Sequence, residues 1–302
     1  MDPRASPMLS GVRTAVVVAT KGRPQAVKRL LKVLEQQTLS PSLIVVSATE
    51  EADLGTKFNT WMKVDVILGS AGTSIQRNRA LDRVQGRCDA VFFFDDDFVP
   101  SPHWIERSVS VFRADLSVAG VSGRVIRDGA ALSDAVSWEE ADRLISEADV
   151  AEPEHSVSEA RDLYGCNMAF RMSAIGGHVR FDERLALYGW LEDKDFSRTA
   201  KKSGRLVQCG SLIGVHLGLK QGRVSGAKFG YSQIVNPWYL FKKGTLSAKE
   251  AWSNTLRALA INGIKTIRPE SSIDRRGRFK GNMAAVRDLL AGICMPEKAA
   301  EL

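Results

Sequence analysis

The sequence predicts an α/β fold with a mostly parallel central sheet flanked by helices, and three observations support this prediction. Short β-branched runs alternate with helical patterns over the first hundred residues, the order that builds parallel strands joined by helices. Residues 91–94 are apolar throughout, as in a strand that is covered on both faces. Three acids follow at 95–97, and open α/β sheets bind ligands where their strands end.

Local patterns place the elements in order. Residues 14–20 are β-branched, and Pro24 suits the first turn of the next helix, in which Leu30 and Leu34 share one face. Ser74 is suited to cap a second helix. By the same patterns, further strands are expected at 42–47, 64–68, 118–125, 165–170, 206–208 and 212–217, and helices at 74–84, 102–112, 138–148, 191–203, 231–243, 248–261 and 283–291, with a basic link at 275–280.

Composition describes an ordinary globular protein of 302 residues, 44% hydrophobic and 25% charged. No stretch approaches the roughly 20 apolar residues of a membrane span, and the polar start lacks a signal-peptide core. We therefore expect a cytoplasmic protein with a flexible tail at 1–11. The four cysteines lack zinc or redox spacing, so we expect them to be reduced.

Positive charge is concentrated in the last third of the chain. From residue 201 onward there are 18 Lys and Arg against 6 Asp and Glu, within a formal net charge of +7. This asymmetry indicates an anionic partner, such as phosphates, an acidic membrane surface or nucleic acid. For any single lysine, a solvated basic face is an equally good interpretation.

The acids at 95–97 predict a cation site. Adjacent carboxylates repel one another unless a cation or a hydrogen-bond donor balances them. Oxygen ligands at the end of a strand suit Mg²⁺ or Mn²⁺ that holds a diphosphate. The alternative is a solvated turn that caps the next helix. Arg77, one strand earlier, could reach the same diphosphate or simply face solvent.

A second acidic group, Glu192 and Asp193, begins an expected helix and follows Trp190. Helix N-termini stabilise carboxylates, so simple capping is one interpretation. The other is a general base that stays ionised and accepts a proton from a hydroxyl. Trp190 offers a flat apolar surface on which a sugar ring could pack.

Together these segments resemble the GT-A-fold glycosyltransferases of family 2, inverting enzymes that use nucleotide sugars. The resemblance covers about residues 12–217. It is carried, in the family's order, by residues 16–24, 36–38, 76–79, 92–100, 165–171, 181–183 and 189–193. It implies a nucleotide-diphospho-sugar transferase fold of Rossmann-like type, with a helical basic C-terminal extension.

The resemblance implies roles for the residues near the first strands. Thr20 and Arg23 would line the nucleotide pocket, and Arg77 would contact the diphosphate. Asp95 would reach the ribose or the sugar. Asp97 would bind the divalent metal, Mn²⁺ or Mg²⁺, with its neighbour Asp96 supporting the donor site.

Further roles follow from the later segments. Asp193 would be the catalytic base, and Glu192 with Trp190 would bind the acceptor. His216 stands where some relatives supply a third metal ligand, although a lone histidine is more often structural. One departure concerns the nucleobase: the family usually has an acid just after the second strand, and here the strand ends with residues 46–50. Ser47 or Thr49 could still form a hydrogen bond with a base edge.

The expected organisation is a GT-A domain at 12–230, divided into a nucleotide-binding half (12–127) and an acceptor half (128–230), followed by a helical extension at 231–302. The expected function is inverting transfer from an NDP-sugar, UDP-linked by preference, to a saccharide or lipid-linked saccharide. Peripheral contact with an anionic membrane is expected from the basic end, and no nucleic acid partner. The alternatives are a sugar-1-phosphate nucleotidyltransferase and a catalytically silent sugar-nucleotide-binding protein.

Overall fold

The computed structural model describes residues 11–132, 134–151, 156–222, 224–267 and 273–302. The tail expected at 1–11 therefore lies, apart from Gly11, outside the described residues. The chain forms two compact units. The first comprises the described residues of Met1–Ala71, Gln76–Arg180 and Phe196–Gln221, and the second those of Gly72–Ile75, Phe181–Asp195 and Gly222–Leu302. The domain boundaries expected from the sequence remain predictions.

A nine-stranded sheet forms the centre of the first unit. Its strands are β1 (Thr14–Ala19), β2 (Leu43–Ala48), β3 (Val64–Leu68), β4 (Ala90–Asp95), β5 (Phe98–Pro100), β6 (Val118–Asp128), β7 (Val157–Glu159), β8 (Asn167–Arg171) and β9 (Arg205–His216). They lie in the order β3-β2-β1-β4-β8-β6-β9-β5, with β7 paired to β9. The first four are parallel, β8 runs antiparallel between β4 and β6, and β6 and β9 are parallel.

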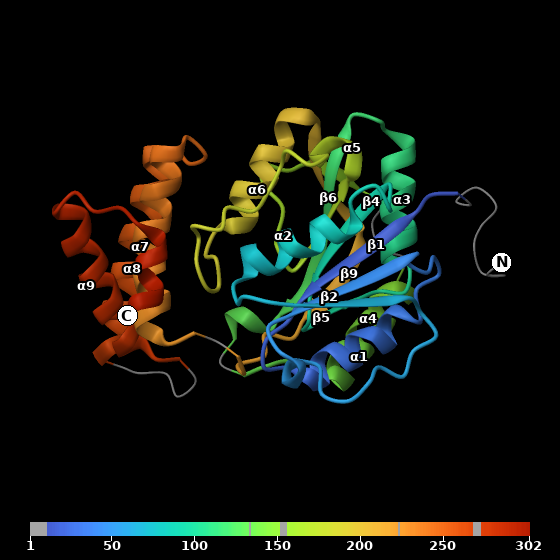
Figure 1. The fold of residues 1–302 in the computed structure, drawn as a ribbon, viewed down its shortest axis with the longest axis horizontal. Helices are drawn as coiled ribbons and strands as arrows, with labels where there is room; N and C mark the ends of the chain where they lie inside the picture. Colours follow the sequence, from blue (N-terminus) through green and yellow to red (C-terminus); the bar gives the residue numbers. More distant parts are fainter. Residues whose placement is uncertain (1–10, 133, 152–155, 223, 268–272) are drawn as a thin grey trace. The chain divides into compact units, whose positions relative to one another are not determined.

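Helices cover both faces of this sheet. They are α1 (Pro24–Leu34), α2 (Thr73–Val84), α3 (Trp104–Ala114), α4 (Trp138–Val150), α5 (Met172–Ile175) and α6 (Glu192–Ala200). Successive side chains of β4 point to opposite faces of the sheet and pack into the hydrophobic core on each face. Phe92 and Phe94 pack against Trp104 of α3, whereas Phe93 packs against Phe196 on the other face. Helix α2 lies on the opposite side of the sheet from α1 (Figure 1).

The predicted α/β fold with a mostly parallel central sheet is confirmed. Strand β4 lies beside β1, with Asp95 in register with Ala19. The acids therefore follow a buried central strand at its carboxyl end, as predicted. Local differences remain. The two short strands expected at 206–208 and 212–217 form one strand, β9, whose register with β6 shifts at irregularities. Strands β5 and β7 and the short helix α5 were not predicted.

Three long helices, α7 (Gly226–Lys243), α8 (Ala248–Ile267) and α9 (Arg275–Leu290), make up most of the second unit. Helix α7 begins earlier than expected, within the glycine-rich stretch, and α9 includes the basic segment expected as a link. Glycines explain both differences. A Cβ on Gly230 would lie 2.1 Å from the carbonyl oxygen of Arg278, and one on Gly281 would lie 2.0 Å from that of Ala227, so α7 and α9 cross closely only because these side chains are absent. Among the described helices, none combines the length and apolar character that crossing a bilayer requires.

Candidate active site

The three acids occupy different environments. Asp95 ends β4, and its side chain is 30% exposed, whereas those of Asp96 and Asp97 are 4% exposed. This decrease in exposure follows from the path of the chain, because Asp96 and Asp97 form the turn between β4 and the buried strand β5. The carboxylate of Asp95 accepts a hydrogen bond of 2.7 Å from Arg77 Nη2. Asp95 is thus the member of the acid cluster that faces solvent.

Asp96 is fixed by two residues that the sequence assigned to the nucleotide pocket. Thr20 Oγ1 donates to one carboxylate oxygen at 2.7 Å, and Arg23 Nη1 donates to the other at 2.8 Å. Burial raises the pKa of Asp96 to about 7, although Arg23 and Thr20 stabilise its charged form. Thr20 and Arg23 therefore support the acid cluster, and contact with a nucleotide remains a prediction for both.

Asp97 anchors the loop that follows β9. One carboxylate oxygen accepts the backbone N–H of Leu219 at 2.8 Å and lies 3.4 Å from Arg23 Nη1. The other oxygen lies 3.4 Å from Nε2 of His216. Burial alone would raise the pKa of Asp97, but bonding to His216 and the charge of Arg23 lower it to about 2. Asp97 is therefore a buried carboxylate that stays ionised.

His216 ends β9 and is in register with Asp128, the last residue of β6. Its Nδ1 lies 2.9 Å from a carboxylate oxygen of Asp128, and Tyr164 Oη donates to the other oxygen of Asp128 at 3.0 Å. Burial alone would lower the pKa of His216, but Asp128 and Asp97 outweigh burial and raise it to about 10. The parallel pairing of β6 and β9 thus places His216 between two carboxylates.

Asp95, Asp97 and His216 could hold a metal ion together. Each offers one ligand atom, and the three atoms lie within 4.8 Å of one another. Two carboxylates and one imidazole suit Mn²⁺ well and leave coordination positions for other ligands. The predicted ligands Asp97 and His216 are therefore brought together, and Asp95, assigned to the sugar or ribose, joins them. A neutral ring protonated at Nδ1, where Asp128 accepts, would offer Nε2 as a ligand.

Arg77 and its neighbour Gln76 form hydrogen bonds with residues at or next to the carboxyl ends of β1, β2 and β4. The buried guanidinium of Arg77 donates to Asp95 and, at 2.8 Å, to the carbonyl of Gly165, and it lies 5.9 Å over the ring of Phe93. Gln76 Nε2 donates to the carbonyls of Thr20 and Ser47, the two residues at the ends of β1 and β2. Of the two interpretations open for Arg77, solvent exposure is excluded.

Ser47 and Asp53 bear on the departure noted after the second strand. Ser47 is fully buried, and its hydroxyl has no hydrogen-bond partner among the residues that the structure describes. Three acids follow β2, Glu50, Glu51 and Asp53, and Asp53 is the buried one. Asp53 accepts hydrogen bonds from Gly22 N at 2.6 Å and from Thr49 N and Oγ1. These bonds tie the loops after β1 and β2 together. Recognition of a base by Ser47 remains a prediction.

The second unit contains the other predicted acids. Glu192 begins α6 and is buried, and Asp193 beside it is half-buried. Trp190 is half-buried and packs edge-on against Phe229 of α7, with ring centroids 5.4 Å apart. Leu191, between Trp190 and Glu192, has a φ of 72°, which a leucine rarely adopts and which costs free energy. The strained turn at Leu191 is thus what presents Asp193 at the start of α6.

Side chains of α7 hold both ends of this turn. Asn236 Nδ2 donates to the carbonyl of Trp190 at 2.9 Å. Lys243 Nζ donates to Asp195 at 2.7 Å and to Asp182 at 2.6 Å, and Tyr239 Oη also donates to Asp182. These contacts, which we call the α7 clamp, compensate for the strain at Leu191 and fix the segment that carries Asp193.

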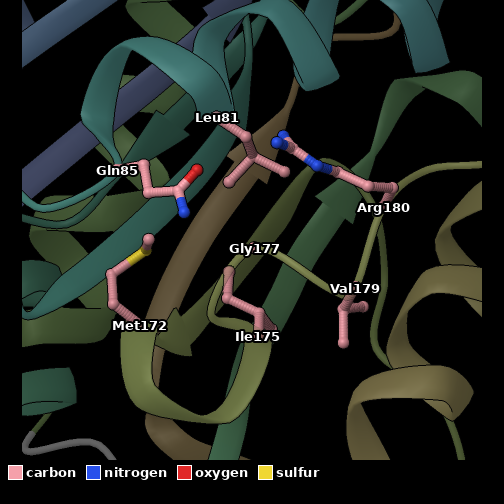
Figure 2. Close-up of a pocket in the computed structure, with 7 residues that line it drawn as sticks. All are labelled: Leu81, Gln85, Met172, Ile175, Gly177, Val179 and Arg180. Atoms are coloured by element: carbon pink, nitrogen blue, oxygen red, sulfur yellow. The ribbon is translucent and has the colours of Figure 1, made fainter.

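A small pocket lies elsewhere in the first unit (Figure 2). It is lined by Leu81 and Gln85 of α2, Met172 and Ile175 of α5, and Gly177, Val179 and Arg180 of the loop that follows. The Met172 amide donates to the carbonyl of Asp89, which directly precedes β4. The pocket is therefore at the opposite end of β4 from Asp95, and it is no part of the candidate site.

Sequence reasoning missed Asp128, Tyr164 and the α7 clamp. Asp128 lies three residues beyond the strand predicted at 118–125, whereas the observed strand β6 continues to Asp128 itself. Tyr164 precedes a segment of the family resemblance but carries no motif of its own. Nothing in the local sequence of α7 indicates that Asn236 or Lys243 contacts residues some 50 positions earlier.

The fold and the cluster of Asp95, Asp97 and His216 define a GT-A type of α/β protein. The sequence model of glycosyl transferase family 2 matches residues 15–176. That match covers more than half of the chain, which therefore belongs to glycosyl transferase family 2. By sequence, no curated protein matches the chain.

Solved structures share the fold at low sequence identity. The mannosyltransferase PcManGT from Pyrobaculum calidifontis, in complex with GDP-Man and Mn²⁺, superposes with a TM-score of 0.50 at 15% identity over 92% of this chain and 87% of that one. S. aureus TarS 1-349 in complex with UDP-GlcNAc gives 0.52 at 15% identity over 96% and 83%. A structure of S. aureus TarS gives 0.49 at 14% identity, and this chain spans 53% of its length. The first two likenesses, to PcManGT and to TarS 1-349, confirm the predicted GT-A fold.

Proposed function

We propose that this protein is an inverting glycosyltransferase that moves a sugar from a nucleoside diphosphate sugar to a hydroxyl of a saccharide or lipid-linked saccharide. The observation that carries the proposal is the convergence of Asp95, Asp97 and His216 at the ends of β4 and β9. Membership of glycosyl transferase family 2 supports the reaction class. A UDP-linked donor is our first choice, and a GDP-linked donor is the second.

The donor side of the reaction falls to the first unit. A divalent cation, Mn²⁺ or Mg²⁺, on Asp95, Asp97 and His216 would supply positive charge to the departing diphosphate. Arg77 adds a fixed guanidinium that already pairs with the solvent-facing acid Asp95. Thr20 and Arg23 hold Asp96 rigidly, so the cluster needs little rearrangement when a donor binds. Ser47 and Asp96 complete the residues proposed for the nucleotide sugar.

The acceptor side falls to Asp193 and its neighbours. The acceptor oxygen forms a bond to the anomeric carbon while the bond from that carbon to the diphosphate breaks, and Asp193 takes the hydroxyl proton. One displacement of this kind inverts the configuration at the anomeric carbon. Glu192 would bind sugar hydroxyls and Trp190 would stack on a sugar ring. The α7 clamp supports this assignment, because it holds in place the turn that presents Asp193.

We further propose that the protein works in the cytoplasm and contacts an anionic membrane peripherally, where a lipid-linked acceptor would be found. The support is the charge of the chain from residue 201 onward, 18 basic against 6 acidic residues. The aromatic segment 238–241 lies in the basic C-terminal part of the chain, next to Lys242 and Lys243. In the structure Leu240 is buried and Tyr239 bonds Asp182, so much of that segment packs inside the second unit.

A donor screen tests the proposal. Purified protein is incubated with UDP- and GDP-sugars, with and without Mn²⁺, and release of the nucleoside diphosphate is measured with saccharide acceptors. We expect metal-dependent release of the nucleoside diphosphate together with transfer of the sugar to the acceptor. Release of pyrophosphate from a nucleoside triphosphate and a sugar phosphate would instead identify a nucleotidyltransferase, and binding of donor without turnover a silent binding protein.

Asp193→Asn tests the base. Because the amide cannot take a proton, transfer should fall by about 10²–10⁴-fold while the dissociation constant of the donor stays within about twofold. Asp134→Asn, an exposed acid of the other unit, is the control and should transfer normally. Normal turnover by Asp193→Asn would show that the base lies elsewhere.

A further inference from the structure

Helix α8 exposes its larger apolar side chains and buries its smaller ones. Its buried positions are Ala251, Thr255, Ala258 and Asn262. Its exposed positions include Trp252, Leu256, Ile264 and Ile267, which are 54%, 57%, 68% and 83% exposed. A helix on the surface of a globular protein normally has the reverse arrangement. An exposed apolar surface of this kind marks a site of interaction.

These side chains form one continuous stripe. Trp252, Leu256, Ala260 and Ile264 recur at every fourth position, and residues four apart lie above one another on a helix. We define the α8 stripe as these four residues and Ile267. A helix of 20 residues is about 30 Å long, so the stripe has the length of an interfacial helix. At one end Trp252 packs on Trp238, with centroids 5.0 Å apart.

The charges beside the stripe are positive. Lys249 and Arg257 are exposed on α8, and neither forms an ion pair with a described residue. The helix has one acid, Glu250, whose carboxylate accepts hydrogen bonds from Ser247 at the helix start. The exposed charged residues of α9, Arg276, Lys280 and Arg287, are also cations and add to the positive charge of the second unit. Apolar residues flanked by cations are complementary to a surface with apolar depth and negative charge.

We propose that the α8 stripe binds an anionic lipid bilayer, with α8 lying along the interface and its apolar side chains in the acyl region. This inference gives the membrane contact of the proposed function a definite surface and rests on that function only for its biological purpose. A second copy of the chain is the weaker candidate. In a symmetric contact through α8, each copy would bring the same cations, Lys249 and Arg257, and Glu250, the one acid of α8, already accepts hydrogen bonds from Ser247.

Vesicle flotation tests the surface. The full chain is mixed with vesicles of phosphatidylcholine alone or of phosphatidylcholine with phosphatidylglycerol, at low and high salt. We expect binding to the anionic vesicles that weakens as salt is added. The double variant Leu256→Gln/Ile264→Gln should partition about tenfold more weakly, because two apolar side chains no longer enter the bilayer.

Two controls separate the contributions. Leu290→Gln changes an exposed leucine of α9 and should bind like the wild type. Lys249→Gln/Arg257→Gln should weaken binding to anionic vesicles by roughly fivefold per cation and leave binding to neutral vesicles unchanged. Calorimetric binding of donor nucleotide by all variants should match the wild type, so a failure of the transferase proposal would appear there and not in flotation.

Two results would overturn the inference. The first is equal binding to anionic vesicles by the wild type and Leu256→Gln/Ile264→Gln. The second is a wild type that ignores vesicles but forms, by light scattering, a dimer that the same substitutions dissociate. That outcome would assign the α8 stripe to a second copy.

Discussion

Asp128 controls how His216 can act. Its carboxylate lies 2.9 Å from Nδ1, so a neutral ring keeps its proton on that nitrogen and turns Nε2 toward Asp97. Hydrogen bonds of this kind orient metal-binding histidines and increase their basicity. Asp128 is therefore a positioning residue, and Tyr164 holds it in turn.

Asp128→Asn should weaken Mn²⁺ binding by about 10–100-fold, the usual effect of losing such a partner. The free Mn²⁺ signal in electron paramagnetic resonance measures this directly. Asp142→Asn, which removes an exposed acid paired with Arg29 at 3.5 Å, should bind Mn²⁺ like the wild type. Unchanged affinity in Asp128→Asn would mean that His216 is not a ligand.

Lys243 is the cation of the α7 clamp. It pairs with Asp182 and with the almost fully buried Asp195. Lys243→Met should lower the free energy of unfolding by about 1–3 kcal/mol, because the buried Asp195 keeps its hydrogen bond from Thr245 but loses the positive charge that offsets its desolvation. The lower half of that range allows for water reaching the half-exposed lysine site. Urea denaturation measures the change, and Lys242→Met, one residue earlier and exposed, should cost little. Equal effects of the two substitutions would contradict the clamp.

The pair of Lys243 and Asp182 predicts that the stability of the fold depends on pH. Burial alone would raise the pKa of Asp182, but hydrogen bonds from Lys243 and Tyr239 lower it below its ordinary value. A lowered pKa means that Asp182 stabilises the fold above its unfolded pKa of about 4 and loses this effect as the pH falls further. Between about pH 4 and pH 2, the free energy of unfolding of Asp182→Asn should therefore fall less than that of the wild type. If the stability of Asp182→Asn depended on pH as that of the wild type does, the lowered pKa of Asp182 would be contradicted.

At the scale of elements, the loops after β6 and β9 meet at two glycines. Gly218 has a φ of 68°, and a Cβ there would lie 2.1 Å from the backbone of Gly129. This approach places Leu219 so that its amide reaches Asp97. The site thus depends on backbone packing as well as on its charged side chains.

Gly218→Ala should cost more stability than Gly244→Ala and should also weaken Mn²⁺ binding. Both glycines have positive φ, but the space around Gly244 is open. Gly244→Ala should cost only about 1 kcal/mol for its backbone conformation, whereas Gly218→Ala adds a clash with backbone that cannot move away easily. Thermal unfolding and Mn²⁺ titration of both variants make the comparison. Equal losses would show that the close contact has no energetic role.

Elements whose local pattern decides their structure were predicted well. Strand β3 has the expected limits 64–68, β1 and α2 differ from expectation by one residue at one end, and β2 is shifted by one residue at both ends. Helix α7 starts at Gly226, before the predicted Tyr231, although Gly226 and Gly230 have low helix propensity. Their lack of a side chain is what lets α9 approach, and that packing is visible only in three dimensions. The role of Asp128 was hidden for a similar reason, since the register of β6 with β9 is set by the whole sheet.

In the whole molecule, acidic and basic residues are concentrated in different parts of the chain. The acid cluster lies in the first unit, where Arg23 and Arg77 offset it, and the excess of Lys and Arg lies after residue 201. The family and the GT-A fold follow from the ordered motifs, and the comparisons confirm both. Donor and acceptor identity could not be predicted, because specificity depends on side chains that no shared motif marks.

The most direct test is calorimetry of UDP and GDP binding with and without Mn²⁺, on the wild type, Asp95→Asn and Asp97→Asn. We expect Mn²⁺ to strengthen the binding of one of these nucleotides to the wild type at least about tenfold, and both substitutions to remove this gain. Circular dichroism should confirm that the variants fold. Equal nucleotide binding with and without Mn²⁺ in all three folded proteins would contradict the proposal that these acids hold the donor through a metal.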